Sequence, residues 1–374
     1  MLRLLSRVQA LRAVAAVATA ALVVTAGAAV AGQTAATPTI TQGIAVLPTI
    51  DDAGTATTFP LHWAAPTAGA KALIVVFHGH THNGDQWQDE LNTMAARNNA
   101  VAVAPRTSEI DGPNGKGVFD TVDEEARDAA SAIAWSRRVH GNLPTYLLCV
   151  SMGCTGLAYF ISMVARGKST SADARWMRAN RPRPIAGIVV SEGLSNLSET
   201  WAEAGAADKT SQAEIEYETR TATGSATPPQ NSDAYRTRSL AMLSPTGFRE
   251  FGAKTAAVVH DVDDGLVPFN QAIESRAALR AGGIPTHGYT IVGNQPGCNT
   301  ENETTFTSYV GSYVETYTGR TEVKDNLDPT LCMSGHAGET HPETTVMRVT
   351  FDVLHRMLTA GVGSGESTIQ PTVR

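Results

Sequence analysis

A serine at the end of an apolar run is the first feature of the sequence that could do chemistry. The run from Thr145 to Val150 stops abruptly at Ser151-Met152-Gly153, and a segment compatible with a helix continues to about Arg166. This pattern predicts a buried strand, a tight turn and a helix. Such a turn exposes the serine hydroxyl beside the first N–H groups of the helix, which together with the helix dipole favour a developing oxyanion.

A serine hydroxyl is a weak nucleophile, so the chemistry also requires a histidine base, a carboxylate that orients this base, and oxyanion donors. The elements that must position these groups alternate along the chain, which predicts an α/β fold with a mostly parallel sheet flanked by helices. Loops at the carboxyl ends of its strands would bring the groups together. The expected strands are 72–77, 100–105, 145–150, 185–190, 255–260 and 287–292, and the other expected helices are 89–98, 120–140, 269–281 and 343–358.

Other segments flank or interrupt this alternation. Residues 34–67 contain short alternating patches that are typical of edge strands in an antiparallel hairpin. Residues 195–252 are polar, with weak helical stretches at 199–207 and 233–243, and we interpret them as an insertion over the carboxyl, active-site edge of the sheet. The last dozen residues are expected to be frayed. We expect residues 32–374 to form a single domain.

The first 31 residues have the composition of an export signal. Arg3, Arg7 and Arg12 precede an apolar, alanine-rich run, and Ala29-Val30-Ala31 offers a small-residue cleavage site. A retained membrane anchor is the alternative, because the run is nearly long enough to span a bilayer. The absence of a basic stop after it favours cleavage. We therefore expect a secreted, extracellular protein without a stable membrane anchor.

The charge balance argues against nucleic acid as a partner. The chain of 374 residues carries 29 basic and 36 acidic residues. Cleavage after residue 31 removes three arginines, which leaves 26 basic residues and a net charge of −10. Polyanion binding needs the opposite sign. With 42% hydrophobic and 17% charged residues, the chain can bury a sizeable core without a metal, and we expect no cofactor.

Two segments resemble the α/β-hydrolase family. Cys149-Val150-Ser151-Met152-Gly153 resembles the family's nucleophile elbow, whose usual form is G-x-S-x-G, with Cys149 at a position that must be small. Phe77-His78-Gly79-His80, after a buried strand, resembles the family's oxyanion loop. The resemblance implies that the backbone N–H groups of His80 and Met152 stabilise the oxyanion.

The same resemblance implies the acid. The segment from His260 to Pro268 is similar to the family's H-G-x-x-D-x-x-V-P segment and puts Asp264 at the position of the acid. Asp261 stands where the family usually has a glycine, which puts the local backbone geometry in question. Glu192, just after an earlier predicted strand, is the second choice for the acid.

The base is expected between the last predicted strand and the last predicted helix. Gly335-His336-Ala337-Gly338 resembles the family's G-H-x-x form, and its small neighbours leave the His336 ring room to reach Ser151. His341, which precedes Pro342 at the start of the helix, is the alternative base. We expect Ser151, Asp264 and His336 to form the catalytic set.

The resemblance covers about Leu61 to Leu358 and implies a serine hydrolase with an acyl-enzyme on Ser151. The loop from His78 to Gly84 is also similar to the corresponding loop of secreted polyester depolymerases and feruloyl esterases. The order of the predicted elements is similar to that of prolyl oligopeptidase-like catalytic domains. A small or polymeric ester is the expected substrate, because no residues that must anchor a peptide amine or proline are evident.

Two other classes of function compete with this hypothesis. Gly79-His80-Thr81-His82 is similar to the G-H-T-H signature of metal-dependent phosphoesterases, and His78, His80 and His82 alternate as ligands on one extended strand could. Almost no chain precedes His78 that could hold the remaining ligands, so no metal is expected. The second alternative, a hydrolase-like protein that only binds, would lack one catalytic residue, and none is missing here.

The cysteines fall into two pairs. Cys298 and Cys332 bracket a polar loop and have no spacing suited to zinc, so we expect a disulfide between them in an exported protein. Cys149 and Cys154 flank Ser151, and we interpret them as small buried residues, with a free Cys154 near the site as the alternative. Their pairing stays open at this point.

Overall fold

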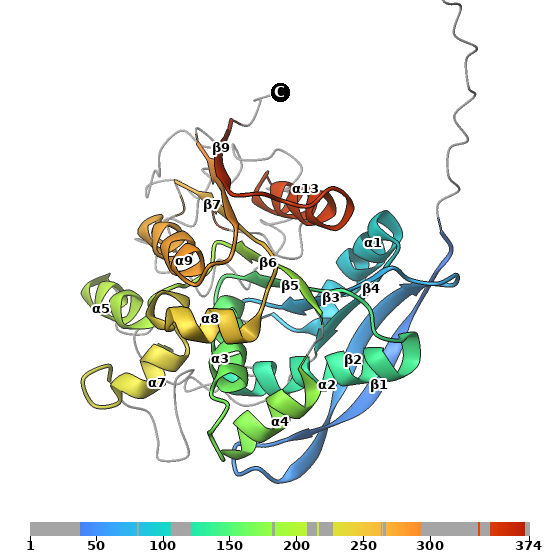
Figure 1. Ribbon diagram of the computed structural model, residues 1–374, viewed down its shortest axis with the longest axis horizontal. Coiled ribbons are helices and arrows are strands. Elements are labelled where there is room, and N and C mark those ends of the chain that lie inside the picture. The colour runs from blue at the N-terminus through green and yellow to red at the C-terminus, as the bar shows by residue number, and fades with distance from the viewer. Residues whose placement is uncertain are drawn as a thin grey trace, which may run out of the picture. The chain divides into compact units, whose positions relative to one another are not determined.

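One sheet runs through the part of the chain that the computed structural model describes (Figure 1). The described residues are 38–80, 82–105, 121–181, 184–207, 215–216, 227–262, 264, 267–292, 336 and 345–370. Within them the strands are β1 (Ile40–Ile50), β2 (Ala56–Pro66), β3 (Ala72–Phe77), β4 (Ala100–Pro105), β5 (Thr145–Val150), β6 (Ile185–Ser191), β7 (Ala256–Asp261), β8 (Thr286–Ile291) and β9 (Gly365–Ile369).

The sheet has the mixed topology that the sequence predicts. Its order is β1-β2-β4-β3-β5-β6-β7-β8-β9. The hairpin β1–β2 is antiparallel and joins β4 antiparallel, whereas every pair from β4 to β9 is parallel. The predicted α/β class and the predicted edge hairpin are therefore confirmed.

Helices cover both faces of the sheet. Helices α1 and α13 pack on one face, and α2, α3, α8 and α9 pack on the other (Figure 1). In the described ranges, no helix combines the length and the apolar composition that a membrane crossing requires. The helices are α1 (Gln88–Asn98), α2 (Val122–His140), α3 (Gly153–Ala165), α4 (Ala172–Asn180), α5 (Leu197–Ala207), α7 (Ser232–Thr237), α8 (Pro245–Phe251), α9 (Asn270–Ala281) and α13 (Thr345–Thr359).

Two hydrophobic cores explain why the central strands read as continuous apolar runs. Along β3, Val75 and Phe77 join the core on the α2–α3 face, and Ile74 and Val76 join the core on the α1–α13 face. Successive side chains of a strand point to opposite faces, so a strand covered on both sides needs apolar residues throughout. The predicted inner strands and the long helices agree with the structure, with end points shifted by one or two residues.

Strand β9 overturns the expectation of a frayed end for Gly365–Ile369. This strand pairs in parallel with β8 at the sheet edge. Glu366 accepts hydrogen bonds from two arginines of α9, Arg276 at 2.7 Å and Arg280. The strand is short and polar, so its sequence carries no apolar alternation. Its pairing with β8 and the ion pairs to α9 define it, and neither is visible in the local sequence.

The 195–252 segment joins an apolar cluster at the carboxyl edge of the sheet. This cluster contains Met152, which follows β5, Leu194, which follows β6, and residues from α5 and α7. Its buried members are Val122, Met152, Leu194, Leu197, Ile215, Tyr235 and Val267. Leu197, Ile215 and Tyr235 of the segment thus lie at the strand ends, whereas Phe248 and Phe251 of α8 join the core on the α2–α3 face. The predicted signal at 1–31 and the predicted Cys298–Cys332 disulfide of residues 298–332 lie outside the described residues.

A buried ion pair fastens this segment to α2. The Arg238 guanidinium donates to the Asp123 carboxylate, with Nε 2.7 Å from Oδ1, and stacks 4.5 Å from the ring centre of Tyr159. Both charged side chains are buried. Burial by itself raises the pKa of the Asp123 carboxyl, and the Arg238 charge and hydrogen bond oppose that rise.

Arg238→Ala is expected to lower the free energy of unfolding by about 3–5 kcal/mol, because it leaves the Asp123 charge buried without its partner. Arg236→Ala is the matched control: Arg236 pairs with Asp233, which is 61% exposed, and such pairs contribute about 0–1 kcal/mol. Urea unfolding of both variants measures the difference. Equal losses in the two variants would contradict this account of the buried pair.

Candidate active site

Ser151 occupies a left-handed turn between β5 and α3. Its φ is +51°, a conformation that residues with a Cβ seldom adopt outside strained functional turns. Its N–H donates to the carbonyl of Ser191 at 3.0 Å. Its carbonyl accepts from the N–H groups of Cys154 at 3.1 Å and Leu194 at 3.3 Å. The turn is therefore held on both sides by the backbone after β6 and the start of α3.

Gly153 is required by the same turn. A Cβ at this position would collide with the carbonyl oxygens of Phe77 and His78, at the end of β3. The first turn of α3 thus lies directly against the loop that carries His80. This contact is the physical reason for the glycine in the Ser-Met-Gly stretch.

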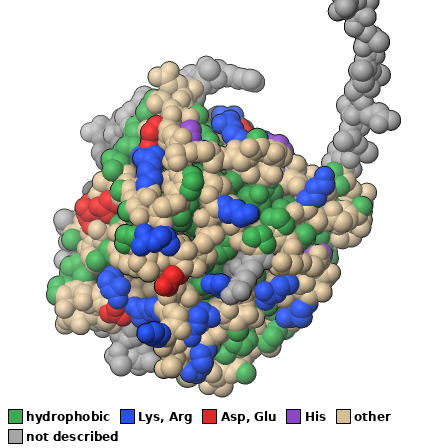
Figure 2. All heavy atoms as spheres, in the orientation of Figure 1, with side chains coloured by type: hydrophobic (Ala, Val, Ile, Leu, Met, Phe, Trp, Pro, Cys, Tyr) green, Lys and Arg blue, Asp and Glu red, His purple; other side chains and the backbone are tan. Residues whose placement is uncertain are grey.

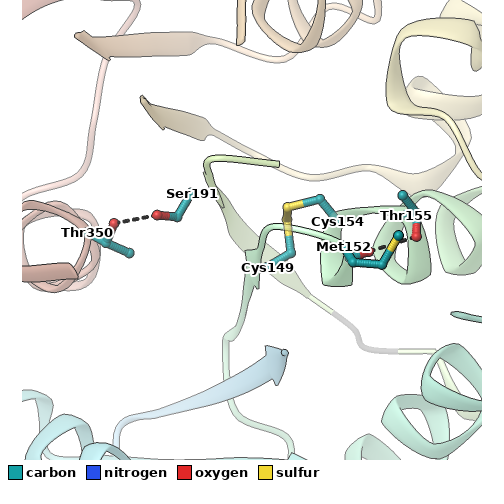
Figure 3. Close-up of a disulfide and its surroundings, with 6 residues drawn as sticks. All are labelled: Cys149, Met152, Cys154, Thr155, Ser191 and Thr350. Atoms are coloured by element: carbon teal, nitrogen blue, oxygen red, sulfur yellow. Dashed lines mark hydrogen bonds between the residues drawn. A yellow bond between two sulfur atoms is a disulfide. The ribbon is translucent and has the colours of Figure 1, made fainter. Parts of the chain in front are cut away.

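A disulfide joins Cys149 to Cys154 across the turn (Figure 3). The two Cα atoms lie 4.9 Å apart, and both side chains are fully buried. The interpretation of these cysteines as separate small residues is therefore wrong, and Cys154 is not a free thiol. The signal that could have found the bond is the spacing: a strand that reverses into a helix within five residues brings both ends of the turn together.

His336 lies between Ser151 and two acids. Its Nε2 is 3.1 Å from Ser151 Oγ, and its Nδ1 is 2.9 Å from Asp264 Oδ2. Ser151, Asp264 and His336 are each 7% exposed, so the series is buried yet in contact with the surface. The structure thus brings together the three residues that the sequence singles out. His341 lies outside the described residues.

The loop after β7 holds the Asp264 carboxylate. Oδ1 accepts from the N–H of Val267 at 2.9 Å. Burial by itself would raise the pKa of Asp264, but the charge and hydrogen bond of His336 and the nearby His260 outweigh burial and lower it. Asp261 is the last residue of β7 and does not adopt a left-handed conformation. A glycine is therefore not needed at that position.

Glu192 is a second acid against the same imidazole. It is fully buried, and its Oε2 lies 3.4 Å from His336 Nδ1. Its φ of +46° places a second strained residue at the site, directly after β6. The sequence marks this residue as the reserve acid, but nothing in the sequence places it beside Asp264.

The expected oxyanion donors border the turn on both sides. Met152 immediately precedes α3, whose first N–H groups have no partner within the helix. No carbonyl among the described residues accepts a backbone hydrogen bond from Met152. His80 follows β3 in the loop that Gly153 contacts from the other side.

The structure does not gather the histidines of the phosphoesterase alternative. His78 Nδ1 lies 4.0 Å from Glu125, whereas His82 Nδ1 lies 3.4 Å from the side-chain oxygen of Gln86. Within the described ranges, the group of three or more acidic, histidine or cysteine side chains whose ligand atoms all lie within 4.8 Å of one another consists of Glu192, Asp264 and His336. The histidine alternation therefore does not produce a metal-ligand cluster in the described part.

A surface depression of about 730 Å³ lies at the other end of α3. Its lining includes Arg166, Lys168, Arg236 and Asp233. Figure 2 shows lysine and arginine side chains gathered on this face of the molecule. Because Ser151 precedes the first residue of α3 and the depression surrounds its last residues, the two sites are separated by the helix length, about 20 Å.

Replacing both Cys149 and Cys154 by alanine is expected to lower the free energy of unfolding by about 2 kcal/mol, the chain-entropy value for so short a loop. Urea unfolding measures the loss. Alkylation of the denatured wild-type protein before and after reduction supplies the control, because these two cysteines should react only after reduction. Alkylation of both without reductant would contradict the disulfide.

His78 is expected to make the protein acid-sensitive. Burial lowers its pKa to about 4, against a weaker opposite effect of hydrogen bonds to backbone carbonyls. As the pH falls, His78 is therefore protonated in the unfolded chain before it is protonated in the folded protein. The free energy of unfolding, which is highest above pH 6.5, then falls by about 3 kcal/mol as the pH drops towards 4. Urea unfolding of His78→Gln should show a flatter pH dependence than wild type, with pH 8 as the baseline. An unchanged slope would contradict the assignment.

Comparison with known proteins agrees with this architecture. No protein-family model and no curated protein matches the sequence. Among solved structures, carboxyl esterase 2 from the mycorrhizal fungus Tuber melanosporum matches over 86% of this chain and 86% of that chain, with a TM-score of 0.54 and 11% identity.

Two further matches have TM-scores below 0.5. Carboxylesterase Cest-2923 from Lactobacillus plantarum WCFS1 matches 75% of this chain and 94% of that chain, with a TM-score of 0.49 and 13% identity. Acylaminoacyl peptidase from Pyrococcus horikoshii matches 67% of this chain but only 36% of that chain, with a TM-score of 0.45 and 13% identity. The sheet order and the match to the Tuber esterase establish the architecture: this chain has the α/β-hydrolase fold.

Proposed function

We propose that the protein is a serine hydrolase that cleaves carboxylic esters through an acyl-enzyme on Ser151. The observation that carries the proposal is the unbroken series of contacts from Ser151 Oγ to His336 Nε2 at 3.1 Å and from His336 Nδ1 to Asp264 Oδ2 at 2.9 Å. A nucleophile, a base and an orienting acid in this order are the parts that acyl transfer to serine requires.

The acid determines which nitrogen of the base is free. The ionised Asp264 carboxylate only accepts, so Nδ1 of His336 carries the proton and donates to it. Nε2 then has its lone pair available and accepts from the Ser151 hydroxyl. In this tautomer His336 can remove the Ser151 proton as Oγ attacks a carbonyl carbon. Asp264 stabilises the imidazolium that forms.

The attack converts the carbonyl oxygen into an oxyanion. The N–H groups of His80 and Met152 are our proposed donors to it, aided by the positive end of α3. His336 then gives its proton to the leaving alcohol oxygen, and the Ser151 ester remains. Water, deprotonated by the same imidazole, attacks this ester and releases the carboxylic acid and the free serine.

The substrate class within the proposal is a small or polymeric ester of a carboxylic acid. The matched structure from Tuber melanosporum is named a carboxyl esterase, which suggests the class to test first. We also propose that the protein is exported. The composition of residues 1–31 and the Cys149–Cys154 disulfide support this, because disulfides persist in oxidising compartments.

Ser151→Ala is expected to lower kcat for p-nitrophenyl esters by at least about 10⁴-fold, because no other group supplies the nucleophile. Ser162→Ala is the matched control, since Ser162 lies on α3 and has the same 7% exposure. It should retain wild-type kcat. Both variants should unfold at the wild-type urea concentration.

Labelling with a serine-directed fluorophosphonate gives the direct measurement. We expect one adduct in wild type and in Ser162→Ala, on the peptide that contains Ser151, and none in Ser151→Ala. Esters of increasing acyl length, tested beside peptide amides of the same acyl groups, separate an esterase from a peptidase. Ester turnover by Ser151→Ala at the wild-type rate would overturn the proposed function.

A further inference from the structure

The proposed base faces two buried carboxyl groups instead of one. His336 Nδ1 is 2.9 Å from Asp264 Oδ2 and 3.4 Å from Glu192 Oε2. The nearest oxygens of the two acids and the ring nitrogen all lie within 4.8 Å of one another. We propose that Glu192 is a second positioning residue, which acts with Asp264 on the same N–H of His336; this inference rests on the proposed function.

Glu192 is held in place by three contacts. Its N–H donates to the carbonyl of Val259 at 2.9 Å, and its Oε1 accepts from the N–H of Asp261 at 3.2 Å. Just before it, Ser191 Oγ and Thr350 Oγ1 of α13 are hydrogen-bonded at 2.7 Å; a dashed line joins these two side chains in Figure 3. Its φ of +46° persists because these contacts over-determine the conformation. The carboxyl group is therefore fixed on β7 at one oxygen and faces His336 with the other.

A purely structural role for Glu192 would explain the contact of Oε1 but not the position of Oε2. An amide side chain would accept the Asp261 N–H equally well, without the cost of burying an acid. The second oxygen, Oε2, lies on the side of the His336 ring that carries the proton. Fully buried carboxyl groups are uncommon unless they are paired, and the imidazole is a partner for this one.

Two carboxyl groups beside His336 would stabilise its protonated form more than one would. When Ser151 transfers its proton to Nε2, the imidazolium gains attraction from both carboxyl groups, and neither needs to move. If one acid is lost, the other still lies within about 4 Å of Nδ1 and can hold the ring. The proton itself stays on Nδ1 throughout.

Among the described residues, the other titratable groups around this cluster come from β7 and α9. His260, on β7, lies with Nε2 3.6 Å from Asp264 Oδ2 and donates to the carbonyl of Val267, and burial lowers its pKa. The positive charge of Arg276, on α9, also lowers the pKa of His260. The Asp261 carboxyl is also buried. Variants of Glu192 leave all these groups in place.

The test compares Glu192→Gln, Asp264→Asn and the double variant. Gln keeps the acceptor for the Asp261 N–H and removes the charge. We expect Glu192→Gln to lower kcat about 10-fold with KM within about 2-fold, and to move the acidic limb of the kcat/KM profile to lower pH. In the Asp264→Asn background the same change should cost about 100-fold, because Glu192 is then the remaining acid.

Asp128→Asn is the control, because it is another buried carboxyl-to-amide exchange, on α2. It should leave kcat and the pH profile unchanged. Equal effects of Glu192→Gln in both backgrounds, or an unmoved pH profile, would assign Glu192 a structural role and overturn the inference.

The Ser151→Ala result separates the two proposals. An inactive Ser151→Ala beside a wild-type Glu192→Gln removes this inference alone, whereas an active Ser151→Ala removes the proposed function as well.

Discussion

The close approach of α3 to the end of β3 is the constraint on which the candidate site depends. Without a Cβ at Gly153, the first turn of the helix reaches the carbonyl groups of Phe77 and His78. Ser151 stands two residues before Gly153 in a left-handed conformation, at the turn between β5 and α3. The Cys149–Cys154 disulfide ties the two ends of the turn covalently.

Parallel pairing then converts this local turn into a multi-residue site. Strands β5, β6 and β7 are neighbours that run in the same direction, so their carboxyl ends lie side by side. Ser151 follows the first, Glu192 the second and Asp264 the third. The hydrogen bonds that join these ends, from Ser151 to Ser191 and from Glu192 to Val259, are backbone contacts between successive strand termini. The side chains of the candidate site are therefore positioned by the backbone pairing of the central strands.

Burial gives the site its electrostatic character. Burial by itself would raise the pKa of Asp264, but His336, His260 and the Val267 N–H outweigh burial and lower it, which favours the ionised carboxylate at low exposure. A second acid at Glu192 makes the cluster unusually rich in carboxyl groups for one imidazole. The 195–252 segment packs apolar side chains against Met152. The ion pair between Arg238 and Asp123 connects this segment to α2.

Local pattern by itself determined the inner strands, the long helices and Ser151 in its turn. Strands covered on both faces require continuous apolar runs, and the strand–turn–helix stretch needs a serine and a glycine in fixed positions. Asp264 and His336 were identifiable because the segments around them resemble a known family. Only the tertiary structure decided that Cys149 bonds Cys154, that Gly365–Ile369 pairs with β8, and that Glu192 stands beside Asp264. These features depend on distances in the folded protein, and the pattern of hydrophobic residues along the sequence carries no information about such distances.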